Sequence, residues 1–250
     1  MTGKAAAGTA KVPAAGKRKV GRPPGSRAAG TSKPGGDAPV GRDTLIDVTC
    51  ELLKTTQPAE ITRALVARQT GVDPSLIRYY FSNRSMLLIA AGQRLTERYQ
   101  DMLERAMARS DGSPQSLLCH RIEALVDLIA TYPYFHRLFV EEIMPSEIPE
   151  ARAVFEAVTA RGSNSYGAIL KAGTDQGVFR EVDHTLLFTA IIGMSEFYTP
   201  GMRVMAQAGG RSSSLPEPEM RAVYTRFICD MVLNGILKPR SDETPSALRP

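Results

Sequence analysis

One short segment of the chain carries side chains that could contact a polyanion. On a helix that turns by about 100° per residue, Ile77 and Phe81 fall on one face. Ser75 and Tyr79 fall on the other face, with Arg78 to one side. A hydroxyl, a guanidinium and a phenol suit phosphate oxygens and base edges in a major groove, and Arg78 is the best candidate for a guanine contact. The competing interpretation is a polar face that only meets solvent.

The sequence offers little that could support catalysis. Cys119 and His120 are neighbours that diverge by about 100° on a helix, so they cannot act together as nucleophile and base. His136, Glu141 and Glu142 do not form a metal-binding motif. Walker A and dinucleotide-binding glycine patterns are absent from the sequence. We therefore expect no enzyme, no metal and no cofactor.

Two short helices joined by a tight turn are predicted to position the polar segment. A first helix is expected over residues 43–54. Thr62 is a plausible N-cap of the second helix, and Gly71 accepts the left-handed turn that ends it. Asp73 can cap the third helix, and Pro74 fits its first position. A turn of roughly three residues between the two helices has the spacing of a helix-turn-helix.

The rest of the chain is predicted to be helical, so the fold class is all-α. A long helix is expected over about residues 84–109, and later prolines and glycines delimit helices of roughly 12 to 24 residues. Pro200 is taken as one such boundary, after a helix over about residues 183–198. The predicted divisions are a disordered basic tail (1–42), a helix-turn-helix domain (43–90), a helical ligand-binding and dimerisation domain (91–238) and a disordered C-terminal tail (239–250).

The first 42 residues carry much of the positive charge. They hold nine Lys and Arg against one Asp, a local net charge of +8, whereas the whole chain is +5 and the remainder therefore −3. Within them, residues 17–25 (KRKVGRPPG) resemble an AT-hook, in which Arg22 would lie in a narrow minor groove. Non-specific attraction to phosphate is the alternative.

Composition places the chain among ordinary globular proteins. Its 250 residues are 43% hydrophobic, enough for a full core. The longest apolar run, near residues 186–192, is too short to cross a bilayer, and the N-terminus lacks the apolar core of a secretory signal, which points to the cytoplasm. Cys50, Cys119 and Cys229 are dispersed and are interpreted as buried or idle thiols.

About 45 residues of the predicted DNA-binding segment match the signature of a known family. The matching residues are Ile61-Thr62, Val66-Ala67, Gly71-Val72, Ile77, Phe81, Arg84 and Leu87-Leu88. In these positions the chain resembles the TetR family of bacterial regulators. It departs from that pattern where Arg78 replaces the usual Tyr and where Arg84 replaces the usual Lys. The second change keeps a cation, whereas the first should alter which bases are read.

The resemblance assigns roles to individual side chains. Thr62 and Arg63 would meet the phosphate backbone, and Tyr80 and Arg84 would clamp phosphates. The residues that would face the groove are Ser75, Leu76, Arg78 and Tyr79. The partner implied is double-stranded DNA carrying an operator, and the chain would join the bacterial nucleoid when bound to it.

The last helices have more apolar surface than one core needs. Helices over about residues 183–198 and 218–238 are apolar over much of their circumference. The resemblance implies that they pair with a second copy in a four-helix bundle, while burial within a larger monomeric core is the alternative. The resemblance also implies a pocket among the middle helices. Its candidate lining residues are Tyr132, Phe135, His136, Phe139, Tyr166 and Met194.

Together these features predict a dimeric, sequence-specific regulator, a repressor that a small molecule releases from a palindromic operator. The long helix from Arg84 would convey the ligand signal. One alternative is a non-enzymatic helical interaction module that binds nucleic acid without sequence preference through residues 1–42. Another is an all-α carrier of small molecules, against which the basic residues Arg63, Arg78 and Arg84 argue.

Overall fold

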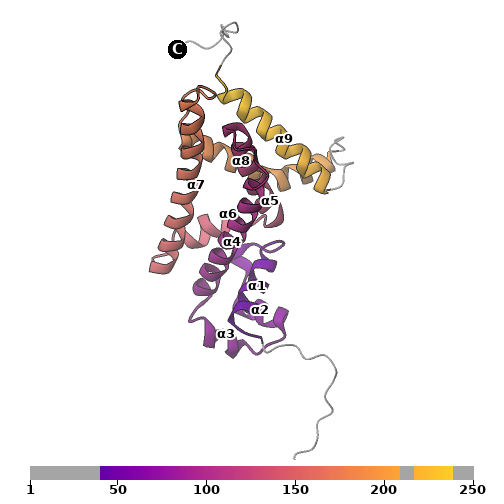
Figure 1. Cartoon of the computed structure of the whole chain (residues 1–250). Coiled ribbons are helices and arrows are strands. Elements are labelled where there is room, and N and C mark those ends of the chain that lie inside the picture. The colour runs from indigo at the N-terminus through magenta and orange to yellow at the C-terminus, as the bar shows by residue number, and fades with distance from the viewer. Residues whose placement is uncertain (1–39, 209–216, 239–250) are drawn as a thin grey trace, which may run out of the picture. The chain divides into compact units, whose positions relative to one another are not determined.

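We describe the protein from a computed structural model, which covers residues 40–208 and 217–238 (Figure 1). Within these ranges the chain forms nine α-helices, one 3-10 turn and one π-helical turn. In chain order they are α1 (Arg42–Leu52), η1 (Pro58–Glu60), α2 (Arg63–Thr70), α3 (Pro74–Tyr80), α4 (Arg84–Met107), α5 (Pro114–Thr131), α6 (Phe135–Arg137), η2 (Leu138–Ile143, the π turn), α7 (Pro149–Asp175), α8 (His184–Gln207) and α9 (Glu217–Ile236). The predicted all-α class is confirmed.

Local side-chain caps determine where α2 and α3 begin and end. The hydroxyl of Thr62 accepts a hydrogen bond from the Leu65 amide at 3.1 Å, which contributes about 1 kcal/mol to a helix start. Gly71 ends α2 with φ at 70°, a left-handed conformation that costs other residue types about 1 kcal/mol or more. The Asp73 carboxylate accepts from the Ser75 amide at 2.7 Å. These contacts fix the turn between α2 and α3.

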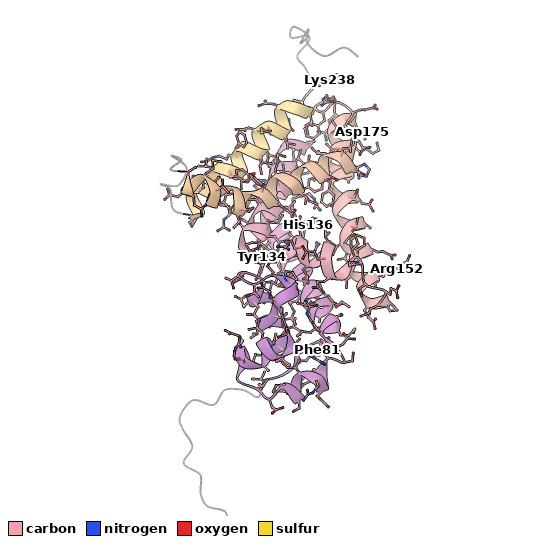
Figure 2. All side chains as sticks on the ribbon, turned by 180° about the vertical axis from the view of Figure 1, so that it is seen from behind. Phe81, Tyr134, His136, Arg152, Asp175 and Lys238 are labelled. Carbon is pink, nitrogen blue, oxygen red and sulfur yellow. The ribbon has the colours of Figure 1, made fainter. Side chains whose placement is uncertain are left out.

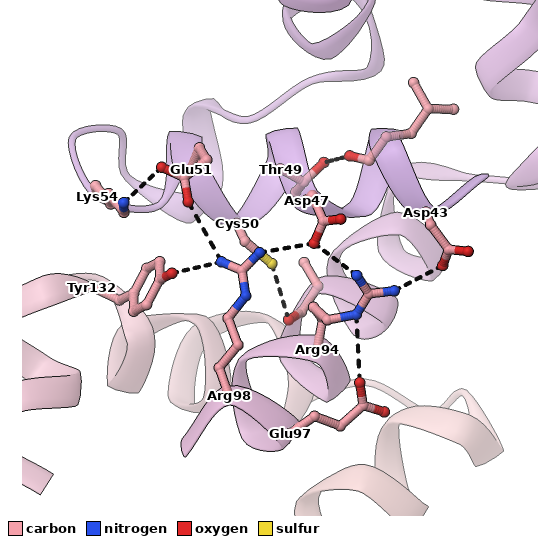
Figure 3. A network of polar contacts seen from close by, with 12 residues as sticks. Asp43, Asp47, Thr49, Cys50, Glu51, Lys54, Arg94, Glu97, Arg98 and Tyr132 are labelled. Carbon is pink, nitrogen blue, oxygen red and sulfur yellow. Dashed lines mark hydrogen bonds and ion pairs between the residues drawn. The ribbon is translucent and has the colours of Figure 1, made fainter. Parts of the chain in front are cut away.

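A polar network attaches α1 to α4 (Figure 3). The Arg94 guanidinium donates to Asp43 and to Asp47, each at 2.7 Å. One turn further along α4, Arg98 donates to Asp47 at 2.8 Å and to the Tyr132 hydroxyl at 2.5 Å. Because Tyr132 follows α5, the network ties the first helix to α4 and to the end of α5.

Two hydrophobic cores lie along α4 and α5. The first is built from α1 to α4 and includes Leu45, Ile77 and Leu87, but it also takes in Leu128 and Phe139. The second lies among α5, α7, α8 and α9. In Figure 1 the helices α1 to α3 lie together at one end of α4, and α8 and α9 lie near its other end. The core under the helix-turn-helix therefore extends beyond residue 90 into α5, η2 and α7.

The structure corrects the predicted end of one helix. Pro200 was expected to stop it, but α8 runs through Pro200 to Gln207. Proline lacks an N–H and so cannot donate to the carbonyl of Glu196 four residues earlier, yet the helix continues beyond this gap. In the described ranges the sole β pairing is an isolated bridge between Phe179 and Leu237.

Candidate DNA-binding surface and ligand cavity

Helix α3 presents a polar face that the other described residues leave exposed. Its inner side is held by Ile77 and Phe81, which are almost completely buried, and the Arg42 guanidinium lies 5.2 Å from the centre of the Phe81 ring. Phe81, which follows the last residue of α3, is labelled in Figure 2. On the outer side, Ser75 and Arg78 are exposed and Tyr79 is 80% exposed. The helix therefore offers a hydroxyl, a guanidinium and a phenol to a partner.

The residues that flank this face are partly engaged within the protein. The Arg63 guanidinium donates to the Ser82 carbonyl at 3.3 Å. Tyr80 is half-buried and meets Tyr79 edge to face, with ring centres 5.0 Å apart. Leu76 is half-buried, and Thr62 is exposed at the start of α2. The two helices therefore place these predicted contacts on neighbouring parts of one surface.

Arg84 is used inside the protein. Its guanidinium forms two hydrogen bonds of 2.8 Å with the Glu142 carboxylate, one from each terminal nitrogen. Its Nε donates to the Ile61 carbonyl at 2.7 Å, and it also donates to the Pro58 carbonyl. In this structure Arg84 joins the start of α4 to η1 and η2. A phosphate contact by Arg84 would have to compete with these partners.

Arg22 and the AT-hook-like residues around it lie outside the described residues, as do both predicted tails for most of their length. The candidate DNA-binding surface is therefore defined here by α2 and α3 alone.

A cavity of about 490 Å³ lies among the middle helices. It contains three of the six predicted ligand contacts, Phe135, His136 and Phe139. His136, labelled in Figure 2, also pairs with Glu196 of α8, with Nδ1 2.6 Å from the carboxylate. The other lining residues are Thr96, Tyr99, Gln100, Leu103, Arg121, Leu125, Leu128, Ile129, Val140, Met144, Phe155, Val158, Thr159, Arg161, Gly162, Ser165, Phe188 and Ile192. The size suits a small molecule.

The other three predicted ligand contacts are not among the residues that line this cavity. Tyr132 belongs to the core beneath α1 and accepts a hydrogen bond from Arg98. Tyr166 is completely buried beside Arg121. Met194 packs against the second core, and its carbonyl accepts from the Tyr224 hydroxyl at 2.6 Å. Their aromatic or soft side chains fill the cores that surround the cavity.

Sequence reasoning missed Arg121, although the sequence contained a signal. Arg121 stands three residues after Leu118 and four before Leu125, on the apolar stripe of α5. A cation on such a stripe points toward a core or a cavity, and here Arg121 lines the cavity and is 5% exposed.

A second, more open depression of about 680 Å³ lies between α5 and α9. Its lining includes the charged side chains of Glu123, Asp127 and Arg221. Arg221 and Asp127 approach each other to 3.4 Å. The 490 Å³ cavity is the better candidate for a ligand site, because its wall is mostly apolar.

The outer sides of α8 and α9 expose large apolar side chains. Leu186 and Phe197 on α8 are 71% and 64% exposed. The others are Val204 and Met205 on α8 and Val223, Phe227 and Met231 on α9. A group of large exposed apolar side chains can mark an interaction site.

Among the described residues, no group of three or more His, Cys, Asp and Glu could hold a metal ion. No described helix is long and apolar enough to cross a membrane. The three cysteines are free, and burial raises the pKa of Cys50 to about 12, so that its thiol stays protonated.

Within the described residues, a helix-turn-helix with an exposed third helix is thus followed by further helices that enclose a cavity. Residues 114–232 match a family model described as "Tetracyclin repressor-like, C-terminal domain". The regulator BetI of Klebsiella pneumoniae is 33% identical over 92 residues, which are 36% of this chain and 45% of that protein. The Escherichia coli BetI is 33% identical over 87 residues, 34% of this chain and 43% of that one. The chain thus matches less than half the length of these relatives.

Solved structures share the fold over most of the chain. KstR2, a ketosteroid transcriptional regulator of Mycobacterium tuberculosis, aligns with a TM-score of 0.60 at 15% identity, covering 82% of this chain and 98% of that one. A protein of Saccharomonospora viridis described as a transcriptional regulator, solved with choline, aligns with a TM-score of 0.57 at 17% identity, covering 79% and 98%. The chain is therefore similar to tetracycline-repressor-like regulators over residues 114–232, and it shares the fold of these solved structures.

Proposed function

We propose that the chain is a sequence-specific DNA-binding repressor that a small molecule releases from a palindromic operator. The observation that carries this proposal is the outer face of α3, where Tyr79 is 80% exposed and Arg78 makes no hydrogen bond or ion pair with any described residue. Side chains placed in this way can reach base edges while Ile77 and Phe81 hold the helix on its core.

The DNA contacts proposed from α2 and α3 fall into two groups. Arg78 and Tyr79 would meet base edges, together with Ser75 and Leu76. Thr62, Arg63 and Tyr80 would meet the phosphate backbone, which fixes orientation without reading sequence. Arg84 would act by positioning η1 beside α2, unless its pair with Glu142 opens on DNA.

A homodimer would present two copies of α3. The exposed apolar side chains of α8 and α9 support this part of the proposal, since a second copy of the same surface would remove them from water. Two recognition helices about 34 to 36 Å apart would enter successive major grooves of a near-palindromic site.

The contacts of η2 support a route for the ligand signal. Phe139 and Val140 of η2 line the cavity, and Glu142 of the same π-helical turn holds Arg84 at the start of α4. A ligand that shifts η2 would therefore act on Arg84, which holds η1 at the start of α4. Such a ligand lowers operator affinity by the difference in its binding free energy between the two states.

Selection of random duplex DNA by the purified full chain tests the proposal. We expect a near-palindromic consensus that is lost in Arg78→Ala and in Tyr79→Ala. Each change should weaken binding to the selected site by roughly tenfold or more, the usual effect of removing a base contact.

Arg152→Ala is the matched control, because Arg152 is exposed on α7 (Figure 2) and its salt bridge within the described residues is with Glu156 of the same helix. This variant should select the same consensus as the unaltered chain. If no sequence is enriched above random, specific recognition by α3 is ruled out, and binding through the basic residues 1–42 becomes the better explanation.

A further inference from the structure

The cavity contains a cation that no described anion balances. Arg121 of α5 lines the cavity, and only 5% of its surface is exposed. Its Nε has no hydrogen-bond partner in the described part of the chain. No described carboxylate lies within 4.0 Å of its guanidinium. A buried charge without a counterion is unfavourable in a folded chain, so such groups are paired or wait for a ligand.

The two phenols near Arg121 do not supply the missing negative charge. The Arg121 guanidinium carbon lies 4.7 Å from the centre of the Tyr166 ring, an attraction that recovers part of the cost of burial. Burial raises the pKa of Tyr166 and of Tyr99, so both phenols remain neutral. The Tyr166 hydroxyl also has no hydrogen-bond partner among the described residues. Neither phenol therefore supplies a negative charge beside Arg121.

The rest of the cavity wall is mostly apolar and carries no carboxylate among its described residues. No Asp or Glu is among its lining residues. The nearby Glu196 carboxylate is held by His136 at 2.6 Å. Arg161 is exposed, and the hydroxyls of Thr96 and Ser165 already donate to carbonyls of their own helices. Among the described lining residues, Arg121 is thus a buried cation without a carboxylate partner.

We propose that the cavity binds an amphipathic monocarboxylate, with its carboxylate on Arg121 and its apolar part along Phe135, Phe139 and Val140. A carboxylate matches the planar donors of a guanidinium, and the apolar wall buries a chain or ring. A quaternary ammonium such as the choline bound by the Saccharomonospora viridis protein would meet a positive charge here. The inference rests on the proposed function in taking this cavity as the effector site.

Calorimetric titration of the full chain without DNA, using three probes of matched chain length, tests this ligand class. The probes are decanoate, decanamide and decyltrimethylammonium, with phenylbutyrate as a second acid. We expect decanoate to bind at least roughly tenfold more tightly than decanamide, and the cation to bind most weakly. The proposal is overturned if the cation or the amide binds as tightly as the acid, or if neither acid binds saturably.

Two arginine variants test which guanidinium of the cavity wall binds the carboxylate. Arg121→Met should weaken decanoate by roughly tenfold or more and leave decanamide nearly unchanged, which also shows that the cavity still forms. Arg161→Met removes the other arginine of the wall and should change the decanoate affinity by less than about threefold, because that side chain is exposed. Loss of decanoate binding in Arg161→Met alone would overturn the assignment to Arg121.

The ligand class and the proposed function fail in different ways. If decanoate binds as expected but does not release the selected DNA, the ligand class stands and repression relieved by ligand is wrong. If the chain selects a palindromic site but binds neither acid, the regulator stands and the monocarboxylate is wrong.

Discussion

Two arginines on neighbouring helices, Arg84 and Arg121, occupy opposite electrostatic situations. At the start of α4, Arg84 donates hydrogen bonds to the Glu142 carboxylate and to two backbone carbonyls. In the cavity, the Arg121 guanidinium lies over the Tyr166 ring, and its Nε has no hydrogen-bond partner among the described residues. The first guanidinium is satisfied by the protein itself, and the second is not.

The difference separates a residue that stabilises the fold from one that is available to a ligand. A paired guanidinium fixes the elements that supply its acceptors, here η1 and η2. An unpaired one costs stability in the free protein, and that cost is recovered when an anion binds. We therefore expect Arg84→Met and Arg121→Met to change the free energy of unfolding by different amounts and in different directions.

Arg84→Met should have the largest effect on stability. We expect the free energy of unfolding to fall by about 2 to 3 kcal/mol, because Glu142 and two backbone carbonyls lose a charged donor in a partly buried site. Urea denaturation followed by circular dichroism measures this change.

Arg152→Met is the control for Arg84→Met, since the exposed pair of Arg152 and Glu156 should contribute less than about 0.5 kcal/mol. Equal losses in the two variants would show that the Arg84 contacts contribute no more than a surface pair.

Arg121→Met should leave the unfolding free energy unchanged or raise it by about 1 kcal/mol in the absence of ligand. Methionine fills a similar volume without a buried charge. Removing the cost of burying that charge offsets the lost contact with the Tyr166 ring. The same urea titration, with no added carboxylate, gives the value. A loss above about 2 kcal/mol would mean that the protein itself pairs this guanidinium.

The smallest expected effect is the coupling between the two changes. In the double variant Arg84→Met/Arg121→Met, the change in unfolding free energy should differ from the sum of the two single changes by less than about 0.5 kcal/mol. The two side chains share no partner in the described structure, so neither change should alter the cost of the other. A larger coupling, measured by a double-mutant cycle in urea, would mean that the cavity and the junction act as one unit even without ligand.

Much of the fold could be predicted because local chemistry determines it. Thr62, Gly71 and Asp73 set the ends of α2 and α3 through contacts with residues two to five positions away, and these assignments are confirmed. Pro200 shows the limit of local rules. Its missing N–H was expected to end a helix, yet α8 continues past it to Gln207.

The candidate site could be predicted only in part. Phe135, His136 and Phe139 line the cavity, because they lie on the short segment that follows α5. Tyr132, Tyr166 and Met194 are of equally suitable types but lie in the cores around it. Residue type shows which side chains could line an apolar cavity, and packing decides which of them reach it.

The sequence alone determined the helix-turn-helix, the buried and exposed faces of α3, and the apolar excess of the last two helices, since each depends on periodicity and caps within a few residues. Only the tertiary structure decided the partners of the charged side chains. Arg84 and Glu142 are 58 residues apart in the chain, and their pairing depends on how η2 packs against α4. The isolation of Arg121 likewise depends on which helices close the cavity, because electrostatic pairing follows distance in space rather than position along the chain.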